Sequence, residues 1–469
     1  MARGDRPLPL ACLLLALSAC TAPPSGDDDV GDTGDGTDTG ETGDTGQALR
    51  PNWHEDIAPI AYANCVGCHS DGGIAPFSLE DYQQAAAWSA SIDQVVASGE
   101  MPPWGALETE ECQPEHSWAN DLRLADADKQ LIADWVAAGS PEGDPADAVE
   151  LPAPPDLSLA DPTATFQNPT PFSVEGTEDS FICFSIDPGL TSDVWVTGVQ
   201  MVPDNQKVVH HALIYADPDA NSAAVAGPDG SYPCFGTAGV SANLIGTWVP
   251  GAVPTEMPDN VGLSLPAGSR IILAYHYHPT GGGTEIDQSA VALRWTEDPP
   301  AYRGLIELIG NFPTAPELLP GPNDPGGNTL FWIPANVTDH TETMQLTIPN
   351  GVPPIDLFAL GTHMHYVGRD MRVTRTRDGD EQCMIQTPRW DFNWQRNYNI
   401  DASIGNFPKV QGGDVITMRC TYDNTLNNPF LPELLAEQGL DAPVDVLLGE
   451  SSLEEMCLIM FGLAFPNFP

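Results

Sequence analysis

The stretch KVVHHALIYADPD, residues Lys207–Asp219, places two adjacent histidines in a run that otherwise favours a β-strand. Neighbouring side chains on a regular strand point to opposite faces, so His210 would face one side and His211 the other. The two imidazoles reach one site together only where the strand bulges, twists or ends. This stretch alone does not decide between the two arrangements. The other histidines of the chain provide further evidence.

The second half of the chain has the sequence pattern of an all-β protein. It follows a Pro-rich linker, and short β runs alternate there with turns of Gly, Pro, Asn and Asp. This pattern predicts one or two β-sandwiches. Seven of the ten histidines fall in this region, and six of them form close pairs: His210 with His211, His276 with His278, and His363 with His365.

The two H-x-H pairs favour a metal site. Alternation along a strand puts both imidazoles of such a pair on one face, where they can chelate one ion. The same pattern also occurs on exposed strands without an ion, but three histidine pairs in one β region favour metal binding. Near the C-terminus, Met456 offers a thioether beside Cys457. Two imidazoles with a thioether favour Cu(I), and three imidazoles suit copper in either oxidation state, whereas zinc makes poor use of a Met.

Length and charge limit the function classes. The chain has 469 residues, which is enough for about three domains. It carries 66 acidic and 17 basic residues, a formal net charge of −49. Such a chain repels nucleic acid, so a nucleic-acid-binding function is excluded.

The N-terminus predicts export. Residues 1–19 have two arginines and then a short apolar run, as in a signal peptide. The ending LSAC resembles a bacterial lipobox, so Cys20 is expected to carry a lipid; cleavage by the ordinary signal peptidase, without a lipid, is the alternative. Residues 20–50 are rich in Asp, Thr and Gly and predict a disordered acidic linker. We expect a lipoprotein tethered to a membrane, periplasmic or on the cell surface.

The first folded segment contains the motif C-x-x-C-H, with Cys65, Cys68 and His69. This spacing is typical of covalent haem c attachment, with His69 as an axial iron ligand. A zinc site would need a second Cys cluster, and a redox pair would sit in a βαβ pattern. Met101 in SGEMPPW is the predicted second axial ligand, although a single Met more often packs in a core. Residues 51–148 therefore predict a mostly-α cytochrome c domain, followed by a linker over 149–165.

Six cysteines remain for disulfides, because an exported chain meets an oxidising compartment. They allow fifteen pairings, among which the residues alone do not choose. The six are Cys112, Cys183, Cys234, Cys383, Cys420 and Cys457.

Four motifs in order, VVHHALIYADP, YHYHPTG, THMHYVGRDM and EEMC, resemble the copper type II, ascorbate-dependent monooxygenases, which include the peptidylglycine alpha-hydroxylating and dopamine beta-monooxygenases. The resemblance covers about residues 166–469. It implies two tandem antiparallel jelly-roll β-sandwiches, 166–300 and 301–469, with one copper in each. The whole chain is thus predicted to be multidomain, with the mostly-α cytochrome c domain followed by two all-β sandwiches.

The resemblance also implies roles for single residues. The electron-storing copper would use His210, His211 and His276, and His278 would not be a ligand. The copper that activates O₂ would use a second set of ligands and hydroxylate a C–H bond. That set is His363, His365 and Met456. The family's disulfide near the methionine implies the pair Cys420 and Cys457.

The sequence departs from the peptide-amidating members of the family. They hold the substrate carboxylate with an Arg, an Asn and a Tyr, where this chain has Gly361, Leu458 and Met460. The charged clamp is absent at these positions, so a less polar substrate is expected.

The function predicted from the sequence is copper-dependent C–H hydroxylation with O₂. The substrate is a small or hydrophobic organic molecule, and an ascorbate-like reductant or a redox protein donates electrons. The hypothesis includes a relay of these electrons by the fused haem. Two alternatives remain: a non-catalytic haem and copper electron-transfer lipoprotein, and a surface recognition protein built of β-sandwiches. The residues do not identify the substrate, the physiological reductant, the membrane leaflet or the oligomeric state.

Overall fold

The computed structural model describes residues 50–467 except 72, 74, 177, 250–251, 311–316, 325 and 327–328. The predicted signal peptide, Cys20 and nearly all of the acidic linker lie outside the described residues, and they stay predictions. Residues Arg50–Pro469 form one compact unit. Among the described residues, no helix is long and apolar enough to span a bilayer.

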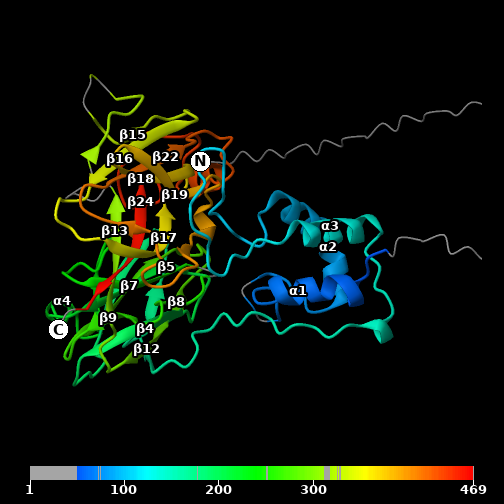
Figure 1. The fold of residues 1–469 in the computed structure, drawn as a ribbon, viewed down its shortest axis with the longest axis horizontal. Helices are drawn as coiled ribbons and strands as arrows, with labels where there is room; N and C mark the ends of the chain where they lie inside the picture. The colour runs from blue at the N-terminus through cyan, green and yellow to red at the C-terminus, as the bar shows by residue number, and fades with distance from the viewer. Residues whose placement is uncertain are drawn as a thin grey trace, which may run out of the picture. The chain divides into compact units, whose positions relative to one another are not determined.

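Most of this unit is built from three large sheets (Figure 1). A ten-stranded sheet has the order β1-β12-β4-β9-β13-β24-β17-β20, with β8 added beside β4 and β21 beside β17. Two five-stranded sheets have the orders β6-β3-β10-β5-β7 and β14-β16-β22-β18-β19. Two small ladders, β2 with β11 and β15 with β23, complete the described strands.

The strands of the first half are β1 (Ala164–Gln167), β2 (Phe172–Val174), β3 (Ser180–Ile186), β4 (Val194–Val202), β5 (Val209–Asp217), β6 (Ser231–Pro233), β7 (Asn243–Trp248), β8 (Thr255–Glu256), β9 (Val261–Leu265), β10 (Arg270–Tyr277), β11 (Glu285–Asp287) and β12 (Ala290–Thr296). Those of the second half are β13 (Tyr302–Gly310), β14 (Glu317–Leu318), β15 (Trp332–Ile333), β16 (His340–Thr347), β17 (Ile355–His363), β18 (Gly368–Arg377), β19 (Asp380–Thr387), β20 (Asn397–Asn399), β21 (Lys409–Val410), β22 (Val415–Tyr422), β23 (Val446–Leu447) and β24 (Leu458–Pro466).

In each half, a five-stranded sheet packs against part of the ten-stranded sheet. In the first half β7 lies so close to β4 that a Cβ added at Gly246 would come within 2.8 Å of Val199. In the second half the disulfide Cys420–Cys457 joins β22 to the segment before β24. These two residues are the pair that the family resemblance implies. Each half is therefore a sandwich of two sheets.

The two sandwiches share their ten-stranded sheet. Strand β13 pairs in parallel with β9 through Tyr302 and Val261, and it pairs antiparallel with β24. Strand β24 in turn pairs antiparallel with β17, and Figure 1 shows it between β13 and β17. Backbone hydrogen bonds therefore run without a break from the first half of the chain into the second.

The predicted mostly-α cytochrome c domain is wrong. The chain is mostly β and only 15% helical, and no separate mostly-α domain is present in the described residues. Three helices, with a small core around Trp53 and Trp135, precede the sandwiches. The described helices, short turns included, are η1 (Trp53–Ile57), α1 (Ala58–Asn64), α2 (Tyr82–Ser98), α3 (Asp126–Ala137), η2 (Pro145–Asp147), α4 (Ser222–Val225), η4 (Phe392–Trp394) and α5 (Leu431–Glu437).

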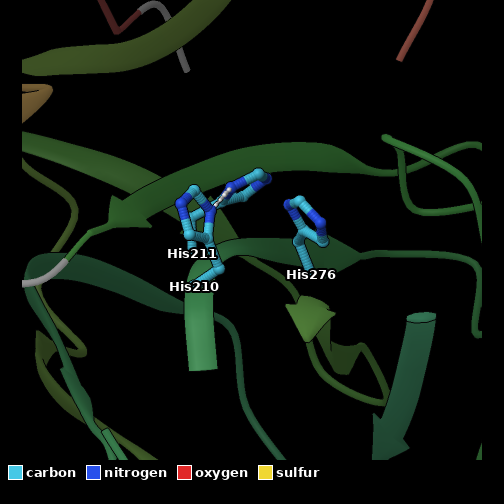
Figure 2. Close-up of side chains that lie close together, drawn as sticks. All are labelled: His210, His211 and His276. Carbon is cyan, nitrogen blue, oxygen red and sulfur yellow. Dashed lines mark hydrogen bonds between the residues drawn. The ribbon is translucent and has the colours of Figure 1, made fainter. Parts of the chain in front are cut away.

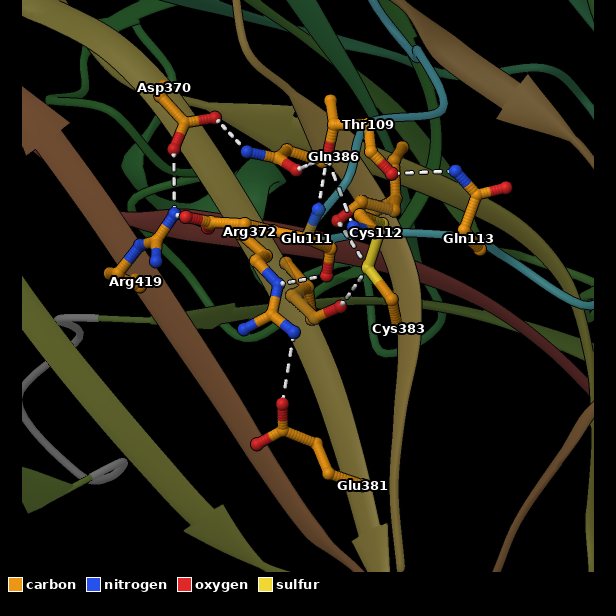
Figure 3. The surroundings of a disulfide bond; sticks show 12 residues. Thr109, Glu111, Cys112, Gln113, Asp370, Arg372, Glu381, Cys383, Gln386 and Arg419 are labelled. Atoms are coloured by element: carbon orange, nitrogen blue, oxygen red, sulfur yellow. Dashed lines mark hydrogen bonds and ion pairs between the residues drawn. A yellow bond between two sulfur atoms is a disulfide. The ribbon is translucent and has the colours of Figure 1, made fainter.

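The physical reason is that the segment between α2 and α3 belongs to the second sandwich. Cys112 forms a disulfide with Cys383 of β19, and Glu111 receives hydrogen bonds from two arginines of that sandwich (Figure 3). The backbone N–H of Leu107 donates to Gln386 O, and Trp118 lies in the same core as the β-strands. Covalent and backbone links therefore make this segment part of the β unit.

Removing the Cys112–Cys383 disulfide should loosen this segment. We expect C112S/C383S to lower the free energy of unfolding by about 2–5 kcal/mol, because the bond closes a loop of 271 residues. Urea denaturation measures the loss, and limited proteolysis with mass spectrometry locates new cleavage near Cys112. The matched control C183S/C234S also removes one disulfide but should leave this segment protected. Protection of the segment in C112S/C383S would contradict the assignment.

Candidate metal centres

A β-bulge answers the question raised by the adjacent histidines. Strands β5 and β10 pair with His276 opposite His211 and Tyr277 opposite Val209, so His210 is an extra residue on β5. A bulge turns the extra side chain toward the same side as its neighbour. The two imidazoles therefore point to one place, and β10 brings His276 beside them (Figure 2).

His210, His211 and His276 form a compact set of nitrogen donors. One ring nitrogen from each can be chosen so that all lie within 4.8 Å of one another. The Nδ1 atoms of His210 and His211 are 3.2 Å apart. Such spacing suits a single metal ion bound by three imidazoles. The structure brings these three predicted ligands together, and their role as copper ligands remains a prediction.

Asp179 lies beside the imidazoles of both His276 and His278. Its Oδ2 lies 3.0 Å from His276 Nε2, although the contact lacks hydrogen-bond geometry. Its Oδ1 lies 2.7 Å from Nδ1 of His278, and Ser452 donates a hydrogen bond to Oδ2. His276 Nδ1 is buried without a hydrogen-bond partner in the described part of the chain. That nitrogen is thus available to a metal ion, while His278 is held by the carboxylate.

Burial keeps the imidazoles of His210 and His211 in the neutral form that binds a metal. It lowers the pKa of His210 to about 3 and the pKa of His211 well below its usual value. Neighbouring imidazoles act in the same direction, because a second positive charge is unfavourable nearby. A neutral imidazole has a free nitrogen lone pair, so no proton has to leave before a metal ion binds.

The second predicted set lies where β17 and β24 meet. His363 pairs with Leu458 at the end of the antiparallel ladder, and His365 and Met456 each lie two residues beyond it. The rings of His363 and His365 are 5.2 Å apart and nearly perpendicular. Met456 is buried, with 7% of its surface exposed. All three residues therefore lie at or just beyond the end where β17 and β24 pair.

Both imidazoles of this set use Nδ1 for hydrogen bonds within the protein. His363 Nδ1 lies 2.6 Å from Gln395 Oε1, and His365 Nδ1 lies 2.9 Å from the carbonyl oxygen of Glu454. Since both partners are acceptors, Nδ1 carries the proton and Nε2 keeps its lone pair. This arrangement is typical of histidines that bind a metal through Nε2. Burial lowers the pKa of both histidines, to about 3 in His365.

The buried carboxylate of Glu455 holds the backbone around the second set. Its Oε2 accepts the N–H groups of His365 and Met456, and its Oε1 accepts those of Val367 and Gly368. Burial raises the pKa of Glu455 to about 8, and the four N–H donors oppose that rise. One carboxylate thus fixes the backbone on both sides of the centre.

An internal cavity of about 150 Å³ connects the two sets. Its lining includes His211 of the first set and all three residues of the second. Most of its other lining residues are apolar, among them Phe181, Leu213, Trp248, Val249, Val253, Leu308, Leu458 and Met460. Polar groups also line it, namely Arg396, Asn397, Asn399 and Glu450, together with Gln395.

The three positions at which the charged substrate clamp is missing lie in the wall of this cavity. Gly361, Leu458 and Met460 all line it, so these positions do face the same space as the histidines. Arg396 supplies a guanidinium from another segment, and Asn397 Oδ1 would lie 2.5 Å from a Cβ at Gly361. The sequence comparison by position missed both residues, because Arg396 directly precedes β20 and Asn397 begins it, in a different part of the chain.

The C-x-x-C-H motif lies outside this cavity, just after α1. Cys65 and Cys68 are free thiols, and burial raises the pKa of both, to about 12 in Cys65. His69 Nδ1 lies 3.1 Å from the carbonyl oxygen of Phe77, which leaves Nε2 without a proton. Met101 follows α2, with its N–H bonded to Val95 O. It stays a prediction as an axial ligand.

The sequence predicted six metal ligands but missed most residues that position them. Asp179 and Gln395 contact their histidines from distant parts of the chain, and no local pattern marks them. Glu455 had a signal, because it stands directly before Met456 in the motif EEMC. The remaining histidines lie in other contacts: His54 near Glu142, His116 against Trp118, and His340 with Glu342.

Comparison with known proteins points to one family. Residues 334–432 match the model of the copper type II ascorbate-dependent monooxygenase, C-terminal domain. This match relates the second sandwich to the copper type II monooxygenases. Similar curated proteins are DBH-like monooxygenase protein 2 of Mus musculus, 27% identical over 56% of this chain and 39% of that protein, and DBH-like monooxygenase protein 1 of Homo sapiens, 28% identical over 47% and 35%.

The chain matches less than half of the length of these relatives. Among solved structures, the major capsid protein P2 of bacteriophage PM2 aligns with 62% of this chain and 98% of its own, at 9% identity and a TM-score of 0.24. That score is too low to indicate a shared fold. The sequence matches therefore support the family, and the activity of the whole chain is a matter for proposal.

Glu455→Gln tests the role of the buried carboxylate. The side-chain NH₂ of glutamine accepts no hydrogen bond, so two of the four backbone N–H groups lose their partner. We expect the free energy of unfolding to fall by about 2 kcal/mol or more. Glu433→Gln on the exposed side of α5 is the control and should change it by less than about 0.5 kcal/mol. Equal effects of the two variants in urea denaturation would refute this role.

Proposed function

We propose that this chain is a copper-dependent monooxygenase that hydroxylates a C–H bond of an organic substrate with O₂. One observation carries the proposal: members of two sets of imidazole and thioether donors line the same largely apolar cavity. The first set has three imidazoles, and the second has two imidazoles and a thioether. The match of residues 334–432 to the copper monooxygenase family supports the same chemistry.

The donor chemistry fits copper at both sets. Three imidazoles hold copper in either oxidation state, and the thioether of Met456 favours Cu(I) at the second set. The two groups would differ in the nitrogen they use, since His276 offers Nδ1 and His363 and His365 offer Nε2. Bound copper would supply one-electron chemistry with O₂, and the second set would be the place where O₂ reacts.

Other residues of the chain would bind the substrate, exclude water and hold the histidines in one orientation. Trp248, Leu458 and Met460 give the cavity apolar walls that bind a substrate of low polarity and exclude water. Gln395 and the Glu454 carbonyl hold His363 and His365 in one tautomer, so the donor atoms keep their direction. Arg396 and Glu450 are the charged groups that could orient a polar end of the substrate. An ascorbate-like reductant or a redox protein would supply two electrons for each hydroxylation.

We further propose that Cys65, Cys68 and His69 hold one covalent haem, which can pass electrons to the copper centres. The free thiols and the spacing of the motif support this proposal, as does the hydrogen bond that orients His69 with Nε2 available. Attachment to the same chain would raise the effective concentration of such a donor. The proposed location is an exported protein with a lipid on Cys20.

Metal analysis tests the copper proposal. We expect two copper ions per chain in the loaded protein and one in each of H210A/H211A and H363A/H365A, because each variant removes two donors of one set. His54→Ala is the control and should keep two. Copper measured by mass spectrometry after dialysis gives the result. Loss of both ions in either double variant, with the fold intact, would contradict two separate centres.

Met456→Leu separates metal binding from packing. Leucine keeps most of the apolar volume but has no sulfur donor, so Cu(I) should bind more weakly at the second set only. We expect O₂ consumption with a C–H substrate and reductant to fall at least tenfold, while thermal stability changes little. Unchanged O₂ consumption would show that the sulfur takes no part.

Covalent haem is tested directly on the full chain. Expression with a cytochrome c maturation system should give one c-type haem per chain in the pyridine haemochrome spectrum. C65S/C68S should lose this spectrum and keep two copper ions, whereas C112S/C383S should keep the haem. Absence of covalent haem in the wild-type chain would refute this part of the proposal.

A further inference from the structure

A second, larger pocket also has Phe181 in its wall. It has a volume of about 610 Å³, and its wall includes Phe181 and Phe235. Phe181 also lines the 150 Å³ cavity that contains the second donor set. This residue therefore belongs to the walls of both spaces. Phe235 exposes 53% of its surface, so its ring is accessible from solvent.

From this pocket, packed rings lead to the first donor set. The ring of Phe235 lies 4.6 Å from that of Phe181, measured between centroids. Phe181 in turn stacks on His276 at 4.5 Å with an angle of 15° between the planes. Only one ring therefore separates the exposed Phe235 from a predicted copper ligand.

The same packing continues to the second donor set. The ring of His276 lies 5.0 Å from that of His210, and His210 stacks on Phe392 at 4.8 Å and 21°. Phe392 is buried, and its ring lies 6.0 Å from that of His365. We call the six rings Phe235, Phe181, His276, His210, Phe392 and His365 the ring series. Each neighbouring pair is in aromatic contact.

We propose that the 610 Å³ pocket binds an uncharged, planar reductant of the hydroquinone class against Phe235, and that electrons pass from it along the ring series to both donor sets. This inference rests on the copper function proposed above. It adds two points to that function: where an external reductant binds, and to which chemical class this reductant belongs.

The lining of the pocket favours a neutral aromatic donor. An exposed phenylalanine ring offers a face on which a planar ring stacks. Glu178 and Asp179 add carboxylates to the wall, and the chain has a net charge of −49. An anionic donor such as ascorbate is repelled by this charge, whereas a hydroquinone is not. Gln438 and Ser451 provide groups that can hydrogen-bond its hydroxyls.

The electron transfer balances with copper as the acceptor. A hydroquinone gives one electron to one Cu(II), losing one O–H proton to water and becoming a semiquinone. The semiquinone gives a second electron and its second proton, so that one quinone and two Cu(I) result. The phenylalanine rings are not themselves oxidised. They fill the distance between donor and metal with packed atoms, where a void or loose water would weaken the electronic contact.

The test is anaerobic reduction of the copper-loaded full chain without substrate. Loss of the Cu(II) signal in electron paramagnetic resonance is followed after mixing with increasing hydroquinone. We expect Phe235→Ala to raise the half-saturating hydroquinone concentration about tenfold, because it removes the stacking face, and to lower the maximal rate, because it also removes the first ring of the series. Phe235→Tyr should behave like the wild type. Leu426→Ala, which removes an equally exposed apolar side chain outside the pocket, should also have no effect.

Phe392→Leu tests the inner end of the ring series. Reduction of the first set should keep its rate, and reduction of the second should slow at least tenfold, with Phe392→Tyr restoring it. H363A/H365A, which retains the first set alone, identifies the signal of that set. Thermal denaturation shows whether each variant is folded. Equal rates at both sets in folded Phe392→Leu would overturn this half of the series.

Other outcomes overturn the binding site itself. Two bound copper ions with wild-type hydroquinone dependence in Phe235→Ala would show that the donor binds elsewhere. A half-saturating concentration of ascorbate equal to that of hydroquinone would overturn the charge argument. Loss of reduction in C65S/C68S, with Phe235→Ala unaffected, would place the entrance at the proposed haem. Absence of copper from the wild-type histidines would instead refute the proposed function.

Discussion

The register of β24 is the constraint on which the metal region depends. This last strand pairs with β13 on one side and with β17 on the other, so it holds the shared sheet of both sandwiches together. The pairing of His363 with Leu458 also brings together the segments that carry His365 and Met456, and the Glu455 carboxylate accepts the backbone N–H of both. A slip of one residue would turn every side chain of β24 to the opposite face and move Met456 away from the histidines. Backbone hydrogen bonds thus determine the donor geometry before any metal binds.

Hydrogen bonding then determines which nitrogen the imidazoles of the second set offer. Their Nδ1 atoms donate to oxygens, so Nε2 keeps its lone pair, whereas in the first set the Asp179 carboxylate lies 3.0 Å from His276 Nε2. The two sets are therefore chemically different although both are rich in histidine. Burial favours neutral rings in both, because an imidazolium would be poorly solvated there. Distinct roles for two copper ions can follow from these contacts alone.

The sequence predicted the β sandwiches and the grouping of histidines because alternation and H-x-H spacing are local properties. It left the adjacent pair undecided, since the bulge at His210 depends on the partner strand. It was wrong about a separate helical domain, because a C-x-x-C-H motif says nothing of Cys112 pairing with Cys383. The sequence did not identify Asp179 and Phe392 for the same reason, because each contacts histidines that are far away in the chain. Contacts of high sequence separation carry no signature that a single sequence displays.

The proposed reaction has two conflicting requirements, exclusion of water from the substrate and access of a reductant from solvent. Phe181 lines both of the spaces concerned. A reaction that creates an oxidant strong enough to attack a C–H bond requires a closed, largely apolar space that excludes water. A reductant requires free exchange with solvent, because each turnover consumes it. Phe181 lines both the 150 Å³ cavity and the 610 Å³ pocket, and its ring stacks on His276. In the proposed scheme electrons would reach the donor sets through this ring, so the reductant would not have to enter the substrate cavity.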